Sequence, residues 1–242
     1  MMINKDNLKI KLFADGAGLD QIKLMNELDY ISGFTTNPSL IRQAGIEDYE
    51  SFAKTLLSYV DKKSVSFEVF ADEIEIMKKQ ALKIASWGNN VAVKIPITNT
   101  KGESTNELIG ELTKEGISCN VTAIFTINQM IPVLEKIDNQ ASIIFSIFAG
   151  RIADAGNDPE EPIKEAISLV REIPKAEILW ASSRELYNII QAMNCGCHII
   201  TVGHDLLNKI DTFGKNLDQY SLETVKMFYQ DALKSKYKIN NK

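Results

Sequence analysis

Short apolar runs alternate with longer segments of helical period along the whole chain of 242 residues. Strict alternation of strand and helix implies parallel strands. Eight such units in a chain of this length fit a closed (β/α)8 barrel. An open doubly wound sheet is the alternative, but no G-x-G-x-x-G motif follows the first apolar run. The alternation therefore predicts a single α/β domain over residues 1–242, a (β/α)8 TIM barrel.

The bounds of the expected strands and helices are set where the spacing of apolar residues changes between the strand period and the helix period. Strands are predicted at 8–14, 31–36, 64–70, 90–97, 117–124, 141–148, 177–182 and 198–203. Helices are predicted near 19–28, 47–60, 73–86, 105–115, 126–137, 159–173, 184–194, 205–210 and 221–237. In the last of these, apolar residues gather on one face, which suits packing on the barrel or on a neighbouring subunit.

Composition narrows the class of protein. Hydrophobic residues make up 45% of the chain and charged residues 24%, as in soluble globular proteins with a full core. The net charge of −5 offers no basic field for nucleic acid. No apolar stretch approaches the length of a membrane span. Three cysteines and no secretory segment indicate a reducing, cytoplasmic setting.

A cluster of potential metal ligands occurs at Cys195, Cys197 and His198. No second group of ligands follows at zinc-site spacing, and the chain has one other histidine, His204. We therefore expect small buried residues leading into a strand, with no metal and no cofactor. Asp154, in a loop rich in turn residues, is likewise expected to be a turn or cap residue.

Lys94 is the residue that carries most chemical information. It lies inside the apolar run 91–97, which is typical of a strand buried on both faces. Desolvation disfavours an ammonium ion, so a buried lysine can present a neutral amine. Such an amine attacks a ketone to form a Schiff base. The alternative is a lysine that extends its head group to the surface.

Polar residues recur at the carboxyl ends of seven consecutive predicted strands, where barrel enzymes hold their active sites. Stability gains nothing from polar groups inside a core, so the recurrence predicts one common site. The residues are Asp15; Thr35, Thr36 and Asn37; Glu68; Lys94; Asn120 and Thr122; Ser146 and Arg151; and Ser182, Ser183 and Arg184.

Seven segments around these residues resemble the transaldolase family, and specifically its short, single-domain branch. They are F-A-D-G-A (13–17), G-F-T-T-N-P-S-L (33–40), S-F-E-V (66–69), V-A-V-K-I-P (91–96), N-V-T-A-I-F (120–125), S-I-F-A-G-R-I (146–152) and W-A-S-S-R (180–184). The resemblance covers almost the whole chain. It implies a barrel of the class I aldolase type that moves a dihydroxyacetone unit from a ketose phosphate to an aldose phosphate in the pentose phosphate pathway.

The resemblance also implies catalytic roles. Lys94 matches the Schiff-base lysine, and Asp15 matches the acid/base that takes a proton from the C4 hydroxyl of the sugar. Glu68 matches a carboxylate that acts through a water, which Thr122 holds. Two carboxylates in different settings commonly divide acid–base work in this way.

Substrate-binding residues follow from the same resemblance. The three-carbon unit is expected to contact Asn37, Asn120 and Ser146, with Thr35, Thr36 and Phe148 in the same pocket. Arg151 and Arg184 match phosphate-binding arginines, since a guanidinium grips phosphate through paired hydrogen bonds. Both are expected to open helical stretches, where free N–H groups favour an anion. The strand pattern A-S-S-R leaves open whether Ser182 or Ser183 joins them.

Other activities stay open within this family. Its fructose-6-phosphate aldolases generally carry Gln where this chain has Glu68, and Tyr where it has Phe148, so both residues favour transfer over release. A further relative acts on a sulfonated fructose, and sulfonate is a tetrahedral anion like phosphate. A barrel that binds sugar phosphates without turnover is the alternative from another class.

Two further expectations concern the surroundings of the site. The polar loop 98–105 follows the lysine strand and could touch substrate. Short relatives assemble as pentamers or decamers and use a C-terminal helix to reach a neighbour. The resemblance therefore implies a homo-oligomer, with the segment 221–237 packed on an adjacent subunit.

Overall fold

The computed structural model describes residues 5, 8–235 and 237–239. Within this part of the chain, eight parallel strands close into a barrel in the order of the sequence. They are β1 (Lys11–Asp15), β2 (Ile31–Thr35), β3 (Ser64–Glu68), β4 (Val91–Pro96), β5 (Cys119–Ile124), β6 (Ile143–Ile147), β7 (Ala176–Trp180) and β8 (Ile199–Gly203). The predicted (β/α)8 barrel is confirmed, and the open sheet is excluded.

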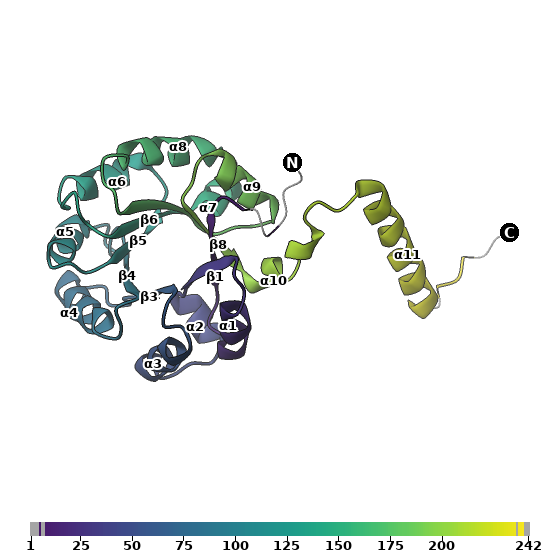
Figure 1. Cartoon of the computed structure of the whole chain (residues 1–242), viewed down its shortest axis with the longest axis horizontal. Coiled ribbons are helices and arrows are strands. Elements are labelled where there is room, and N and C mark those ends of the chain that lie inside the picture. Colours follow the sequence, from purple (N-terminus) through teal and green to yellow (C-terminus); the bar gives the residue numbers. More distant parts are fainter. Residues whose placement is uncertain (1–4, 6–7, 236, 240–242) are drawn as a thin grey trace.

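Helices cover the outside of the barrel (Figure 1). Those the periodicity predicts are α1 (Leu19–Asn26), α3 (Tyr49–Tyr59), α4 (Ile74–Ala85), α5 (Asn106–Lys114), α6 (Ile127–Leu134), α8 (Glu160–Leu169), α9 (Tyr187–Asn194) and α10 (His204–Leu207). A short 3-10 turn, Ile210–Thr212, follows α10. Most predicted ranges were a few residues too long, because the apolar period continues into the residues that cap each element.

Two helices were missed by the sequence analysis. They are α2 (Pro38–Gln43) and α7 (Ala149–Asp154), each of six residues. A helix this short completes less than two turns, so it shows no apolar period. Both begin within three residues of a strand end, after β2 and after β6. They therefore bring backbone and side chains directly to the carboxyl end of the barrel.

Alternation along the strands separates an outer and an inner layer of side chains. On β6, Phe145 and Ile147 pack in the main core between barrel and helices, whereas Ser146 lines a cavity inside the barrel. A smaller inner cluster of Phe13, Ile144, Leu179, Ala181 and Ile199 fills the barrel, with partly buried Phe148 packed against it. Polar residues take the inward positions nearer the carboxyl ends of the strands. The apolar cluster therefore forms a floor beneath a polar chamber.

The last helix, α11 (Leu217–Ser235), stands apart from the barrel (Figure 1). None of its residues is buried. It begins four residues before the predicted segment 221–237, and residue 236 of that segment lies outside the described residues. Its exposed apolar residues include Val225, Phe228 and Leu233. The helix thus leaves an apolar face uncovered by its own barrel.

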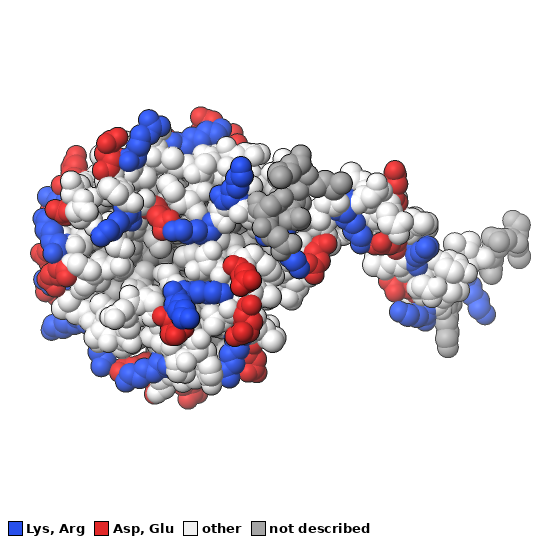
Figure 2. All heavy atoms as spheres, viewed as in Figure 1, with Lys and Arg blue, Asp and Glu red and all other residues white. Residues whose placement is uncertain are grey.

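Charges of both signs are interspersed over the face of the molecule shown in Figure 2. No described helix is long and apolar enough to cross a membrane. The three cysteines are free and buried. His198 Nδ1 accepts a hydrogen bond from the backbone N–H of Ile178 at 2.9 Å, so this ring ties β8 to β7. Among the described residues, no group of three metal-ligating side chains comes together.

Candidate active site

A cavity of about 490 Å³ opens at the carboxyl ends of the strands. Ten of the residues singled out in the sequence line it: Asp15, Thr35, Asn37, Glu68, Lys94, Thr122, Ser146, Phe148, Arg151 and Ser182. Pro38, Ser39, Leu40, Ala123, Ala181 and Thr201 complete the lining. Residues on or just after each strand from β1 to β8 therefore meet in one chamber. The strands are parallel, so all their carboxyl ends lie at the same end of the barrel.

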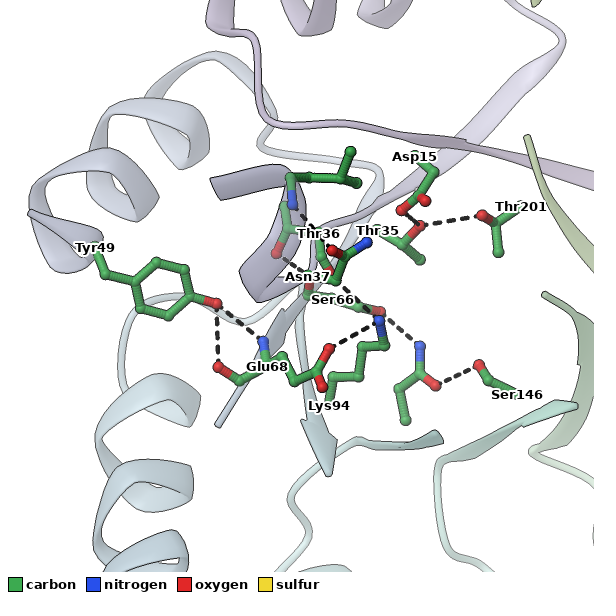
Figure 3. Close-up of polar contacts among 12 residues, drawn as sticks. Asp15, Thr35, Thr36, Asn37, Tyr49, Ser66, Glu68, Lys94, Ser146 and Thr201 are labelled. Atoms are coloured by element: carbon green, nitrogen blue, oxygen red, sulfur yellow. Dashed lines mark hydrogen bonds and ion pairs between the residues drawn. The ribbon is translucent and has the colours of Figure 1, made fainter. Parts of the chain in front are cut away.

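Lys94 lines this chamber and lies among the polar side chains drawn in Figure 3. Strand register places it beside Glu68 on β3 and Asn120 on β5. Its Nζ lies 3.0 Å from Glu68 Oε2 and donates to the carbonyl oxygen of Thr36 at 3.1 Å. The side chains of Lys94 and Glu68 are 9% and 16% exposed, so the pair is largely shielded from water. The lysine therefore points into the barrel and not to the outer surface.

Asp15 ends β1 on the opposite side of the chamber. Its Oδ1 accepts a hydrogen bond from the hydroxyl of Thr35 at 2.7 Å, and that hydroxyl lies 3.4 Å from the hydroxyl of Thr201. Burial raises the pKa of Asp15, although Lys94 and the Thr35 hydroxyl oppose the shift. A carboxyl group with a raised pKa gains and loses a proton more readily near neutral pH, which suits a general acid/base.

Asn120 and Thr36 are fully buried and do not line the chamber. Asn120 is fully buried, accepts from the Ser146 hydroxyl at 2.6 Å and donates to the Ser66 hydroxyl at 3.0 Å. The amide of Asn120 is thus engaged in holding Ser146, which does face the cavity. Ser66 was missed in the sequence, although it occupies an inward position two residues before Glu68.

Asn37 joins β2 to α2. Its side-chain oxygen accepts from the backbone N–H of Leu40 at 3.0 Å and caps the helix, while Pro38 takes a first-turn position that needs no N–H donor. The T-T-N-P-S segment is therefore a strand end followed by a helix cap. Capping uses only the amide oxygen, and the amide nitrogen of Asn37 has no hydrogen-bond partner among the described residues, so this cavity-lining residue keeps a donor for a ligand.

The end of β5 carries an unpaired hydroxyl. Thr122 Oγ1 is buried and has no hydrogen-bond partner among the described residues. A buried polar group of this kind usually binds an ordered water. The next residue, Ala123, has a φ of 60°, and the pairing of β5 with β6 is irregular at this point. This irregularity bends the backbone of β5 at Thr122 and Ala123, which both line the cavity.

Arg151 and Ser182 form the other end of the cavity. Arg151 lies on α7 with its guanidinium 5.2 Å from the centre of the Phe148 ring. Ser182 has a φ of 66°, and its carbonyl oxygen packs against Gly150, where any Cβ would lie 1.6 Å away. Gly150 is therefore the residue that lets α7 approach the loop after β7.

Arg184 is placed differently from expectation. It lies three residues before α9 and not within a helix. Its backbone N–H donates to Asn188 Oδ1 at 2.8 Å. Its Nε donates to Asp154 Oδ2 at 2.9 Å, so Asp154, expected as a turn residue, is its ion-pair partner. Arg184 lines an adjoining cavity of about 330 Å³, which shares Asp15, Ser182 and Thr201 with the main one.

The remaining polar residues near the site have structural partners. The Ser183 hydroxyl donates to the carbonyl of Thr201 at 2.6 Å, so Ser182 is the serine that faces the main cavity. Loop 98–105 does not line the main cavity, since Thr100 bonds to Asp72 and Lys101 to Glu73. Tyr49 and Thr201, which the sequence analysis did not single out, contact Glu68 and Thr35.

Comparisons with known proteins show which family the chain is similar to. A family model described as transaldolase/fructose-6-phosphate aldolase matches residues 12–240. A protein named probable transaldolase from Dehalococcoides mccartyi is 35% identical over 199 residues, covering 82% of this chain and 88% of that protein. A probable transaldolase from Streptococcus equi subsp. zooepidemicus is 35% identical over 202 residues, covering 83% of this chain and 90% of that protein.

Solved structures share the fold at lower identity. Tryptophan synthase subunit alpha from Campylobacter jejuni superposes with a TM-score of 0.56 at 14% identity, covering 90% of this chain and 96% of that one. Orotidine 5'-monophosphate decarboxylase from Metallosphaera sedula gives 0.53 at 12% identity, covering 87% and 98%. Likeness at these identities shows the barrel alone.

Proposed function

The chain belongs to the transaldolase/fructose-6-phosphate aldolase family, and on that premise we propose that it is a transaldolase acting through a Schiff base. It takes a dihydroxyacetone unit from a ketose phosphate, fructose 6-phosphate or sedoheptulose 7-phosphate, and passes it to an aldose phosphate. The observation that carries this proposal is the buried Lys94, paired with Glu68 at 3.0 Å inside a cavity that Asp15 and Arg151 also line.

The first half of the reaction forms the Schiff base. Glu68 is close enough to accept the proton of the Lys94 ammonium, leaving an amine that attacks the C2 carbonyl of the ketose. The C2 oxygen leaves as water, with Glu68 returning a proton through the water that Thr122 holds. The resulting iminium draws electrons from the C3–C4 bond.

The second half breaks and remakes a carbon–carbon bond. Asp15 takes the proton of the C4 hydroxyl, the C3–C4 bond breaks, and the first aldose departs. The three-carbon unit stays on Lys94 as a stabilised carbanion. This carbanion attacks the carbonyl carbon of a second aldose, and Asp15 returns the proton to the new hydroxyl. Water then adds to C2 of the iminium, the C2–N bond breaks, and the new ketose phosphate leaves a free Lys94 amine. The raised pKa of Asp15 suits both directions of proton movement.

Arg151 supports a phosphorylated substrate. It lines the cavity and makes no ion pair with a described residue, so its guanidinium is available to an anion. Two other side chains that line the cavity, Ser182 and Asn37, offer hydrogen bonds to phosphate and sugar oxygens. Sulfonate would satisfy the same donors, so sulfofructose stays an alternative donor that substrate profiling has to separate.

Phe148 favours transfer over release. It lines the cavity, and its ring packs 5.6 Å from that of Phe125. A phenylalanine cannot protonate the three-carbon carbanion, so the intermediate waits for an acceptor aldose. The fructose-6-phosphate aldolase activity is therefore the second candidate, and it requires an acid that this position lacks.

The test is a comparison of two products. With fructose 6-phosphate and erythrose 4-phosphate present together, the enzyme should make sedoheptulose 7-phosphate. With fructose 6-phosphate alone, dihydroxyacetone should appear much more slowly. Equal rates of release and transfer would replace the transaldolase assignment with the aldolase one. Binding without either product would support a barrel that holds sugar phosphates without turnover.

We also propose that the barrel is a single domain and that the chain is a homo-oligomer. The apolar face of α11 is exposed at Val225, Phe228 and Leu233, and no residue in the described part of the chain covers it. Light scattering coupled to size-exclusion chromatography tests this proposal. A mass of one subunit at assay concentration would contradict it.

A further inference from the structure

The hydroxyl of Tyr49 reaches from α3 to the backbone at the end of β3 (Figure 3). It accepts a hydrogen bond from the N–H of Glu68 at 2.9 Å and donates one to the carbonyl of Glu68 at 3.2 Å. One side chain from a helix therefore satisfies both backbone groups of the residue whose carboxylate pairs with Lys94. In a sheet, the backbone N–H and carbonyl of such a residue normally form hydrogen bonds with a neighbouring strand.

The neighbouring strand is missing at this point. Pairing of β2 with β3 ends at Thr35 and Ser66, where the N–H of Thr36 donates to the carbonyl of Ser66 at 3.1 Å. In a continued parallel ladder, the next bond would run from the N–H of Glu68 to the carbonyl of Thr36. The chain turns instead into α2, with Asn37 as its cap.

The carbonyl of Thr36 has another partner. It accepts the hydrogen bond from Lys94 Nζ at 3.1 Å. The ladder acceptor that the Glu68 N–H would have used thus serves the lysine. Because an unpaired N–H at a shielded site costs free energy, another acceptor is needed, and the Tyr49 hydroxyl supplies it.

Tyr49 is held rigidly enough for this role. Its ring packs edge-on against Phe67, Phe70 and Trp87, with ring centroids 6.2, 5.8 and 5.7 Å away. Burial raises the pKa of Tyr49 to about 12, so its hydroxyl keeps the proton that it donates to the Glu68 carbonyl. The aromatic cluster fixes the ring, and the ring fixes the hydroxyl.

We propose that Tyr49 is a positioning residue that holds the Glu68 carboxylate against Lys94. Its hydroxyl replaces the missing β2 partner of Glu68, which frees the Thr36 carbonyl for the lysine. This inference rests on the proposed function, because the pair that Tyr49 positions is the one that makes and hydrolyses the Schiff base. Tyr49 acts through Glu68 and does not line the cavity that holds Lys94.

The matched pair of variants is Tyr49→Phe and Tyr59→Phe. Both remove one hydroxyl from α3, but Tyr59 is 45% exposed at the far end of the helix. We expect Tyr49→Phe to lower kcat for transfer by about 10- to 100-fold, the scale of losses when a catalytic group is misplaced. Its KM for fructose 6-phosphate should stay within about twofold of wild type, because uniform binding is not altered. Tyr59→Phe should behave as wild type.

A double-variant comparison separates positioning from general damage. If Tyr49 acts through the Glu68 carboxylate, Tyr49→Phe should have little further effect on kcat in a Glu68→Gln background. A merely structural role would lower kcat by the same factor in both backgrounds. Equal factors, or a wild-type kcat for Tyr49→Phe, would overturn the inference.

A second readout needs no turnover. The rate at which acetic anhydride modifies Lys94 at fixed pH can be followed by peptide mass spectrometry. Tyr49→Phe should speed modification in the same direction as Glu68→Gln, and the double variant should be no faster than Glu68→Gln alone. An unchanged rate would overturn the inference. An inactive wild type whose Lys94 still responds in this way would overturn the proposed function alone.

Discussion

The two arginines of the anion end should differ in how much they contribute to phosphate binding. Arg151 lines the main cavity and makes no ion pair with a described residue. A charge-assisted hydrogen bond contributes about 1.5–3 kcal/mol. At about 1.4 kcal/mol for each factor of ten, Arg151→Ala should lower kcat/KM for fructose 6-phosphate by about 10- to 150-fold.

Arg184 differs from Arg151 because its guanidinium already forms an ion pair with Asp154. Both side chains of that pair are about half exposed, at 49% and 52%. Exposed pairs contribute about 0.2–1 kcal/mol, and an incoming anion must compete with that. Competition with Asp154 reduces the contribution of the same contact to about 0.5–2.8 kcal/mol, so Arg184→Ala should lower kcat/KM less than Arg151→Ala, by about 2- to 100-fold.

The assay compares charged with uncharged substrates. Steady-state kinetics with fructose 6-phosphate would be set against kinetics with free dihydroxyacetone and glyceraldehyde, which carry no anion. Arg171→Ala serves as the control, since Arg171 is exposed between α8 and β7, at the opposite end of the barrel. Equal losses on charged and uncharged substrates, or a larger loss for Arg184→Ala, would refute the reasoning.

Two further variants test the site from other directions. Phe148→Tyr should raise the release of dihydroxyacetone from fructose 6-phosphate, measured by coupled reduction, because it places an acid beside the carbanion; an unchanged release rate would contradict the branch assignment. Asp15→Asn should abolish transfer yet raise the denaturant midpoint at pH 7. The folded-state pKa of Asp15 is raised, so its ionisation disfavours the folded state as pH rises above the unfolded value of 3.8. The gain should disappear below that pH, and equal gains at pH 7 and pH 3 would contradict the argument.

The barrel could be predicted because its signals are local. Alternation of period two and period 3.6 marks strands and helices, and inward polar positions at strand ends mark a common site. The short helices α2 and α7 could not be found in this way, since six residues carry no period. Their first residues nevertheless lie inside the motifs that contain Asn37 and Arg151.

Contacts between residues far apart in the chain could not be predicted from the sequence. The pairing of Glu68 with Lys94 depends on the register of β3 against β4. Arg184 meets Asp154 across 30 positions of the chain, because Gly150 allows α7 to approach the loop after β7. The sequence analysis did not single out Tyr49, which lies within the predicted helix 47–60. The role of Tyr49 depends on where the hydrogen-bonded pairing of β2 with β3 ends, which is at Thr35 and Ser66.

The central claim is that Lys94 forms a covalent Schiff base with the substrate. The direct measurement is reduction with borohydride in the presence of fructose 6-phosphate, followed by peptide mass spectrometry. We expect a three-carbon adduct on the peptide that contains Lys94, and none in Lys94→Arg, whose guanidinium keeps the charge beside Glu68 but stays protonated. An adduct on another lysine, or an active wild-type enzyme that traps none, would contradict the account.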